Sequence, residues 1–178
     1  MLIKTVFSGF GGQGVIMMGY LLAIAGMYEE KNVTCLPAYG AEVRGGTANC
    51  TVVISTEEIA SPIASEPEFA VLMNNPSLFR FQNQVQSGGT IFLNSSMIES
   101  RPVRGDLEIL EVPVNDLAKK FPGNKVANMI MLGAFIRKSG LTSLDIMLQA
   151  VKDTFGSRNP GVLKSNKNAL QLGFDYLK

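Results

Sequence analysis

Short apolar runs separated by turn residues fill the first two thirds of the chain, and longer helical periodicities follow. Runs rich in Val, Ile, Leu and Phe predict strands over residues 2–8, 32–36, 48–55, 69–73, 90–93 and 107–112. Helices are predicted over residues 13–30, 76–86, 115–120, 124–139, 143–155 and 160–177. This succession predicts an α/β fold, a three-layer sandwich around a mostly parallel or mixed sheet, with a helical C-terminal portion.

Two of the predicted helices carry signals for their first residues. Asn75 followed by Pro76 predicts an asparagine cap and a proline in the first turn of the helix over 76–86. Asn124 is the predicted cap of the helix over 124–139. Both asparagines are therefore expected to begin a helix.

The helix over 13–30 is apolar nearly all the way round. Its small residues Ala23, Ala25 and Gly26 allow a neighbouring element to approach closely. We expect it to be buried between the sheet and a second layer. That layer is either a partner subunit or the rest of the same domain, and the pattern fits both.

Size and charge limit the possible classes of protein. The chain has 178 residues, of which 46% are hydrophobic, and this suits a single domain over residues 1–178. A net charge of +1 gives no reason to expect nucleic acid or membrane headgroups as partners. The longest apolar stretch, 15–28, is shorter than the roughly 18 residues of a membrane span. With no signal-peptide pattern at the start, a soluble cytoplasmic protein is expected.

The cysteine and histidine content excludes several kinds of chemistry. Cys35 and Cys50 are the two cysteines and no CxxC is present, so this chain cannot build a four-thiolate cluster. Both are expected to be reduced core cysteines, with a disulfide as the less favoured alternative. Because the chain has no histidine, Ser-His and Cys-His pairs and histidine-bound zinc are ruled out. No metal site is predicted and no catalytic residue is assigned.

The first motif is the segment 9–14, GFGGQG, which follows a predicted strand and opens a predicted helix. Glycines let a ligand approach the backbone, and the free amides at a helix start attract a phosphate or carboxylate. An NAD site would also need an acid at the end of the second strand, where residues 35–39 read CLPAY, so a dinucleotide is disfavoured. An anion site and a structural turn stay equally open. The candidate cofactor-binding residues are Gly11, Gly12, Gln13 and Gly14.

The second motif is the segment 39–48, YGAEVRGGTA. Pro37 together with Gly40, Gly45 and Gly46 predicts a loop here. Glu42 and Arg44 are two positions apart, so in an extended segment the carboxylate and the guanidinium would share a face and could bind one ligand or partner together. The alternative is a surface ion pair worth about 0–1 kcal/mol. Three glycines and an aromatic in ten residues favour the ligand- or interface-facing loop. The candidate residues are Glu42, Arg44, Gly45 and Gly46.

The third motif is the segment 124–133, NKVANMIMLG, in which Asn128 lies one turn inside an otherwise apolar helix face. A buried asparagine must find a hydrogen-bond partner. From the residues alone, a structural bond to a neighbouring loop is the preferred interpretation. Asn128 is also a candidate cofactor-binding residue, because the three segments taken together point to one family of proteins.

Together, in this order, the three segments resemble the gamma subunit of the 2-oxoacid:ferredoxin oxidoreductases. These enzymes act on pyruvate, 2-oxoglutarate, branched-chain 2-oxoacids such as ketoisovalerate, or aryl 2-oxoacids such as indolepyruvate. The resemblance extends over essentially the whole chain and is most specific at GFGGQGV from residue 9 and YGAEVRGG from residue 39. A short gamma chain without a ferredoxin-like cysteine extension resembles the 2-oxoglutarate type slightly more than the pyruvate type.

The resemblance implies a reaction and partners. The family couples oxidative decarboxylation of a 2-oxoacid to acyl-CoA formation and ferredoxin reduction. It uses thiamine diphosphate, Mg and iron–sulfur clusters held by alpha and beta subunits, with a delta subunit as a further candidate. This chain would be inactive alone, would bind none of those cofactors alone, and would adjoin the thiamine cleft and help to accommodate coenzyme A. The Gly-Asp-Gly of the thiamine–magnesium signature is absent, and residues 104–107, RGDL, are only a fragment of it.

Two other interpretations compete with this one. The first is a free-standing nucleotide-binding enzyme that uses the GxGxxG turn, against which the missing acid of the second strand counts. The second is a purely structural assembly subunit whose glycine loops serve packing. The buried apolar helix does not distinguish an assembly subunit from a cofactor-contacting subunit, because both interpretations predict it.

Overall fold

The computed structural model describes residues 1–40, 46–156 and 160–177 and contains a six-stranded sheet. The strands are β1 (Leu2–Phe10), β2 (Asn32–Tyr39), β3 (Thr47–Ser55), β4 (Phe69–Leu72), β5 (Thr90–Asn94) and β6 (Glu108–Val112). Their order is β2-β3-β1-β4-β5-β6, in which β1, β4, β5 and β6 run parallel while β3 is antiparallel to both β1 and β2. The predicted mixed sheet is confirmed.

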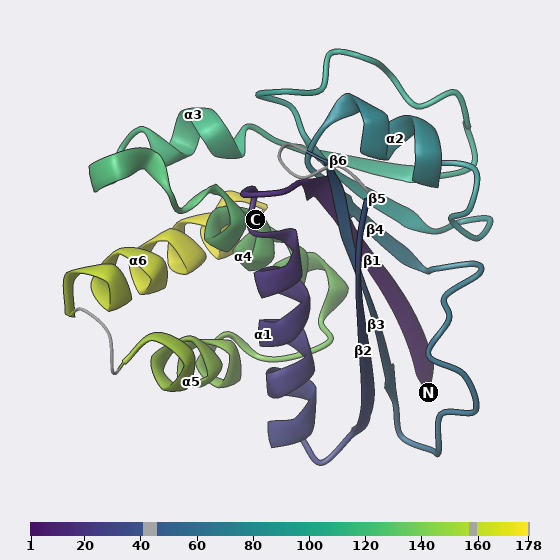
Figure 1. Ribbon diagram of the computed structural model, residues 1–178, viewed down its shortest axis with the longest axis horizontal. Helices are drawn as coiled ribbons and strands as arrows, with labels where there is room; N and C mark the ends of the chain where they lie inside the picture. The colour runs from purple at the N-terminus through teal and green to yellow at the C-terminus, as the bar shows by residue number, and fades with distance from the viewer. Residues whose placement is uncertain (41–45, 157–159, 178) are drawn as a thin grey trace.

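Helices cover both faces of this sheet (Figure 1). They are α1 (Val15–Tyr28), α2 (Asn75–Phe81), α3 (Val114–Ala118), α4 (Ala127–Ser139), α5 (Leu144–Phe155) and α6 (Pro160–Tyr176), with a short 3-10 turn at Pro122–Asn124. Helices α1 and α4 pack on one face, with α5 and α6 against them, and α2 covers the other face (Figure 1). Each face has its own apolar core, the larger one beneath α1 and α4. The three layers and the helical C-terminal portion agree with the prediction.

Four phenylalanines fix α4 over the middle of the sheet. The ring centroid of Phe135 on α4 lies 5.5 Å from that of Phe7, 5.7 Å from Phe69 and 5.3 Å from Phe92, all in edge-on arrangements. Such pairs contribute about 0.5–1.5 kcal/mol each beyond the burial of their area. Because Phe7 belongs to β1, this cluster also sets how close the start of α4 lies to the end of β1.

Helices α4 and α6 meet through glycines. A Cβ added to Gly173 would overlap the carbonyl oxygen of Ile130, and one added to Gly133 would overlap that of Leu170. The two backbones are therefore in direct contact, and no side chain separates them. The contact holds the last helix against α4, which in turn lies on the sheet.

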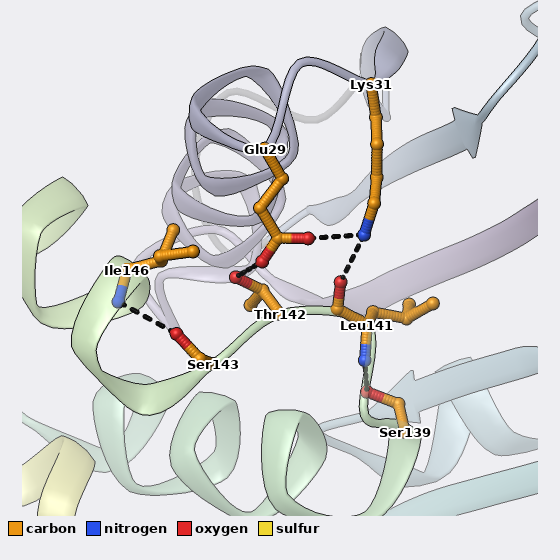
Figure 2. Close-up of polar contacts among 7 residues, drawn as sticks. All are labelled: Glu29, Lys31, Ser139, Leu141, Thr142, Ser143 and Ile146. Carbon is orange, nitrogen blue, oxygen red and sulfur yellow. Dashed lines mark hydrogen bonds and ion pairs between the residues drawn. The ribbon is translucent and has the colours of Figure 1, made fainter.

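A small polar network fastens the end of α1 to the connection between α4 and α5 (Figure 2). The Lys31 ammonium donates to the Glu29 carboxylate and to the carbonyl of Leu141, 3.0 Å away. The hydroxyl of Thr142 donates to the same carboxylate at 2.7 Å. Both charged side chains are only 19% exposed. Burial acts to raise the pKa of Glu29, but the hydrogen bonds from Lys31 and Thr142 and the Lys31 charge bring this pKa below its ordinary value.

We expect Glu29→Gln to lower the free energy of unfolding by about 1–2 kcal/mol at neutral pH. Because folding lowers the pKa of Glu29, its contribution is present above the ordinary glutamate value of 4.5 and is lost as the pH falls through the folded-state pKa. Denaturant unfolding at about pH 7 and about pH 4 measures this difference. The matched control is Glu30→Gln at the exposed neighbouring position. Equal losses for the two variants at neutral pH would contradict the role of the network.

The second strand and the helix after β4 differ from the prediction. The predicted strand 32–36 continues to Tyr39, because β2 is an edge strand and an edge strand tolerates a proline such as Pro37. The predicted helix 76–86 ends at Phe81, and Asn75 does not cap it. Asn74 is the cap, since its backbone is extended and its side chain accepts a hydrogen bond from the Ser77 amide at 2.9 Å.

The predicted cap of the helix 124–139 is also wrong. Asn124 has a φ of 54° and belongs to the preceding 3-10 turn, so its side chain cannot serve the start of α4. Helix α4 follows Val126, which offers no side-chain cap. The first amides of α4 are consequently left without a side-chain acceptor at the cap position.

Candidate functional site

The glycine turn joins the carboxyl end of β1 to the start of α1. Gly12 has a φ of 98° and Gly14 a φ of 75°, conformations that side-chain-bearing residues rarely adopt. Helix α1 then begins at Val15, with Gly14 as its cap residue and no acidic side chain in its first turn. The sequence GFGGQG thus folds as the predicted strand, tight turn and helix.

The side chain of Gln13 is turned back onto the protein. Its Oε1 accepts from the Phe10 amide at 2.6 Å and from Nδ2 of Asn74 at 3.1 Å. Its Nε2 donates to the Met73 carbonyl at 3.2 Å. These bonds fasten the turn to the connection between β4 and α2. Gln13 therefore fixes the shape of the turn.

The three sequence motifs meet at this turn. The amide of Gly11 donates to the carbonyl of Gly46 at 3.0 Å, which joins the first motif to the second. Asn128 packs against Gly14, with its Nδ2 at 3.5 Å from the Gly14 carbonyl oxygen, which joins the first motif to the third. The hydrogen-bond partner expected for Asn128 is thus supplied by the glycine turn itself.

The structure describes only part of the second motif. Glu42, Arg44 and Gly45 lie outside the described residues. Gly46 is buried directly before β3. Of the nine candidate residues, the structure therefore brings together Gly11, Gly12, Gln13, Gly14, Gly46 and Asn128.

A cavity of about 450 Å³ opens beside the turn. Its lining combines backbone from the glycine turn, carboxamide side chains and one cation. The lining residues are Gly12, Gln13, Gly14, Met73, Asn115, Asn124, Lys125, Ala127 and Asn128. This volume is within the range of small-molecule sites.

The fully buried Asn94 braces one wall of the cavity. Its Nδ2 donates to the Met73 carbonyl at 3.2 Å and to Oδ1 of Asn115 at 2.8 Å. Asn94 ends β5, and Asn115 lies just after β6. The carboxyl ends of the parallel strands thus support this wall of the cavity.

The electrostatics of the cavity favour an anion. The starts of α1 and α4 both contribute to its lining, and neither helix has an acidic residue in its first turn. Free amides and the positive end of each helix dipole attract negative charge. Lys125 adds a full positive charge, and no carboxylate lines the cavity among the described residues. A phosphate or carboxylate would be stabilised here.

Several of these lining residues were not among the sequence candidates. Asn115 and Lys125 stand out, together with Met73 and Ala127. One signal could have found the first: asparagines follow or end the successive parallel strands, at Asn74, Asn94 and Asn115. Ligands of open α/β sheets bind at the carboxyl ends of such strands.

The topology disagrees with a dinucleotide site. In a dinucleotide-binding βαβ unit the strand after the helix lies beside the first strand and parallel to it. Here the antiparallel strand β3 lies between β1 and β2, and the parallel neighbour of β1 is β4. The acid that binds a ribose has no equivalent position in this arrangement.

Within residues 104–107, the fragment of the thiamine–magnesium signature, the arginine and the aspartate form an ion pair with each other. Arg104 donates to both carboxylate oxygens of Asp106, and this hydrogen bonding lowers the pKa of Asp106 to about 2. No group of three or more Cys, Asp or Glu side chains suited to a metal ion occurs in the described part of the chain. None of the helices of the described chain has both the length and the apolar character needed to cross a membrane.

Comparison with known proteins shows the family to which the chain belongs. Residues 4–176 match the pyruvate ferredoxin/flavodoxin oxidoreductase family, and the chain belongs to that family. It is 36% identical over 178 residues to the ketoisovalerate oxidoreductase subunit VorA of Methanothermobacter thermautotrophicus, covering 99% of this chain and 36% of that one. It is 32% identical to the 2-oxoglutarate synthase subunit KorC of Methanothermobacter marburgensis, with 96% and 94% covered. The chain thus spans about a third of one relative and nearly all of another.

Solved structures share the fold. The gamma subunit of a keto/oxoacid ferredoxin oxidoreductase from Geobacter sulfurreducens has a TM-score of 0.83 at 26% identity, with 98% of both chains covered. The 2-oxoglutarate:ferredoxin oxidoreductase of Magnetococcus marinus has a TM-score of 0.90 at 21% identity, over 99% of this chain and 31% of that one. The predicted resemblance to gamma-type chains of this family is confirmed.

Proposed function

We propose that this chain is the gamma-type subunit of a ferredoxin-dependent 2-oxoacid oxidoreductase and contributes the cavity at the glycine turn to the coenzyme A site. The complex decarboxylates a 2-oxoacid oxidatively, forms the acyl-CoA and reduces ferredoxin. The observation that carries this proposal is the meeting of two helix starts and Lys125 at a cavity whose described lining has no carboxylate.

The lining suits the chemistry of coenzyme A. Phosphate groups match the free helix amides and the Lys125 ammonium. The amide groups of the pantetheine arm match the carboxamides of Asn115, Asn124 and Asn128, which both donate and accept. The Magnetococcus enzyme, which has this fold within a longer chain, is described with coenzyme A and succinyl-CoA bound.

Other subunits hold the remaining cofactors in this proposal. A four-thiolate iron–sulfur cluster needs four cysteines, whereas this chain has two. The only Asp of the signature fragment, Asp106, is paired with Arg104. Thiamine diphosphate, Mg and the clusters are accordingly assigned to alpha and beta subunits, with a delta subunit as a further candidate, and the chain alone is inactive.

The outer face of α1 supports a role as a subunit. A surface helix normally carries polar residues on its outer face. Here that face consists of Met17, Tyr20, Ile24 and Met27, of which Met27 is 64% exposed. Tyr39 at the end of β2, 72% exposed, lines a shallow pocket together with Tyr20. This apolar surface is the proposed contact with a larger subunit.

The substrate within the proposal is a 2-oxoacid, with 2-oxoglutarate as the first choice. The relatives named for ketoisovalerate and for 2-oxoglutarate are 36% and 32% identical, so their names separate these two substrates little. The 2-oxoacid pocket is expected on the larger subunits. An activity assay of the complex with a panel of 2-oxoacids decides among them.

The first test is a Lys125→Ala variant in the complex, purified anaerobically through a tag on this chain. We expect larger subunits carrying thiamine diphosphate and iron to co-purify with both wild type and variant. The KM for coenzyme A should rise about tenfold in the variant, because one charge-assisted phosphate contact is worth about 1.5–3 kcal/mol. The KM for the 2-oxoacid should stay unchanged. Steady-state kinetics with each substrate limiting in turn measures both constants.

Lys120→Ala is the matched control, since it removes an exposed lysine that does not line the cavity. If neither variant alters the KM for coenzyme A while the complex assembles normally, the chain is an assembly subunit only. Recovery of the chain alone, with a nucleotide bound, would instead support the free-standing enzyme.

A further inference from the structure

The chain's only two cysteines lie side by side beneath α1. Cys35 belongs to β2 and Cys50 to β3, and their Sγ atoms are 3.3 Å apart as free thiols. The cysteine count is two for the entire sequence. Fifteen positions separate them along the chain, and the strand pairing brings them together.

The strand register explains the contact. Cys35 lies opposite Val52 and Cys50 lies opposite Pro37 in the antiparallel pair, so the two cysteines are diagonal neighbours on the same face of the sheet. That face is covered by α1. A Cβ at Gly19 would come within 2.9 Å of the Cys50 Cβ, so the glycine leaves the space that the thiol occupies.

The two thiols are not equivalent. Cys50 is fully buried, whereas Cys35 is half-buried near the sheet edge. The hydrogen bond between them lowers the pKa of Cys35 and, together with burial, raises the pKa of Cys50. The thiolate is the reactive form of cysteine, so the more accessible residue is also the more reactive one. Cys50 stays protonated within reach of it.

We propose that Cys35 and Cys50 form a reversible oxidation site, at which peroxide converts the two thiols into an intramolecular disulfide. The Cys35 thiolate attacks one peroxide oxygen, the O–O bond breaks, and water is released after protonation, leaving a sulfenic acid on Cys35. The Cys50 sulfur then attacks the Cys35 sulfur, a second water leaves, and the S–S bond forms. Two thiols and one hydrogen peroxide thus give one disulfide and two waters, and a dithiol reductant reverses the change.

The fold can accommodate the bond. A disulfide needs its sulfurs about 2.05 Å apart, so the two Sγ atoms, which are 3.3 Å apart as thiols, must approach by roughly 1.2 Å. Strand β2 is at the edge of the sheet and, among the described strands, pairs only with β3, so it can adjust without moving a second one of them. Two cysteines that merely filled the core would instead behave as inert small apolar residues.

The test is peroxide titration of the full chain, reduced and freed of reductant under anaerobic conditions. We expect both thiols to disappear together in a monomeric product, with a linked peptide pair in a non-reducing digest, and dithiothreitol to restore both. Cys50→Ser should stop at a sulfenic acid on Cys35 that dimedone traps. Cys35→Ser should leave the buried Cys50 thiol reacting at least about tenfold more slowly than Cys35 in the wild type.

Several results would overturn the proposal. These are persistence of both thiols at peroxide levels that oxidise glutathione, linkage only between separate chains, and equal reactivity of Cys50 in the Cys35→Ser variant. None of these readouts involves coenzyme A or partner subunits. The oxidation site and the proposed function can therefore fail independently.

Discussion

Replacing Gly173 by alanine is expected to lower the free energy of unfolding by about 3 kcal/mol, at the upper end of the usual cost of overpacking. The added methyl group would overlap the Ile130 carbonyl, which is backbone and cannot rotate away. Helix α6 would have to move off α4, and the contact of Gly133 with Leu170 would open with it. For a chain of this length the loss corresponds to a fall in Tm of roughly 10 °C.

Helix propensity alone predicts that Gly173→Ala raises the stability, so the sign of the change distinguishes the two effects. Alanine is favoured over glycine within a helix by about 1 kcal/mol, so a loosely packed α6 would be stabilised by the change. Thermal unfolding monitored by circular dichroism measures the sign. Gly105→Ala is the control, because a Cβ there meets nothing within 4 Å and its φ is not in the left-handed region. A Gly173→Ala variant as stable as wild type or more stable would show that the two helix backbones are not in contact.

The strands and helices could largely be predicted from the sequence because each is encoded locally. The runs that form β1, β4 and β5 are short and apolar and end at turn residues. The apolar runs on either side of the glycine turn likewise predicted the strand β1 before it and the helix α1 after it. The errors lay at the ends of elements, in the length of β2, the two ends of α2 and the first residue of α4. Asn74 and Asn75 are both good caps, and only the extended backbone of Asn74 decides between them.

The assembly of the site could not be predicted in this way. Gly11 bonds to Gly46 because β3 pairs with β1. Asn128 contacts Gly14 because the phenylalanine cluster holds α4 over β1. Those pairings join residues far apart in sequence. The hydrogen bond between Asn94 and Asn115 depends on strand order, which local patterns do not reveal.

Replacing Gly14 by alanine should impair coenzyme A binding more than the loss of any single side-chain contact with the ligand does. The residue has a φ of 75°, and a side chain in that conformation costs about 1–2 kcal/mol. Its methyl group would also overlap the Asn128 carboxamide and push the start of α4 away from the start of α1. Since the proposed coenzyme A site depends on both helix starts, we expect kcat/KM for coenzyme A to fall about a hundredfold, equivalent to about 2.7 kcal/mol.

Gly12→Ala separates the effect of backbone strain from the effect of a steric clash. Gly12 has a φ of 98°, but a Cβ there meets nothing within 4 Å, so this variant suffers backbone strain alone. We expect it to lose clearly less kcat/KM for coenzyme A than Gly14→Ala does. Adding Asn128→Ala to Gly14→Ala should restore part of the loss, because the two nearest obstructing atoms belong to the carboxamide. Such a recovery is a coupling between residues in contact, and a double-mutant cycle measures it.

The cycle also tests whether the turn and α4 act as one binding surface. If Gly12→Ala and Gly14→Ala are equally impaired and Asn128→Ala restores nothing, the contact between the first and third motifs is incidental to coenzyme A binding. If the recovery appears in kcat/KM for coenzyme A and not in the KM for the 2-oxoacid, the Gly14–Asn128 contact sets the spacing of the two helix starts. That spacing is what a phosphate held by both sets of amides would require.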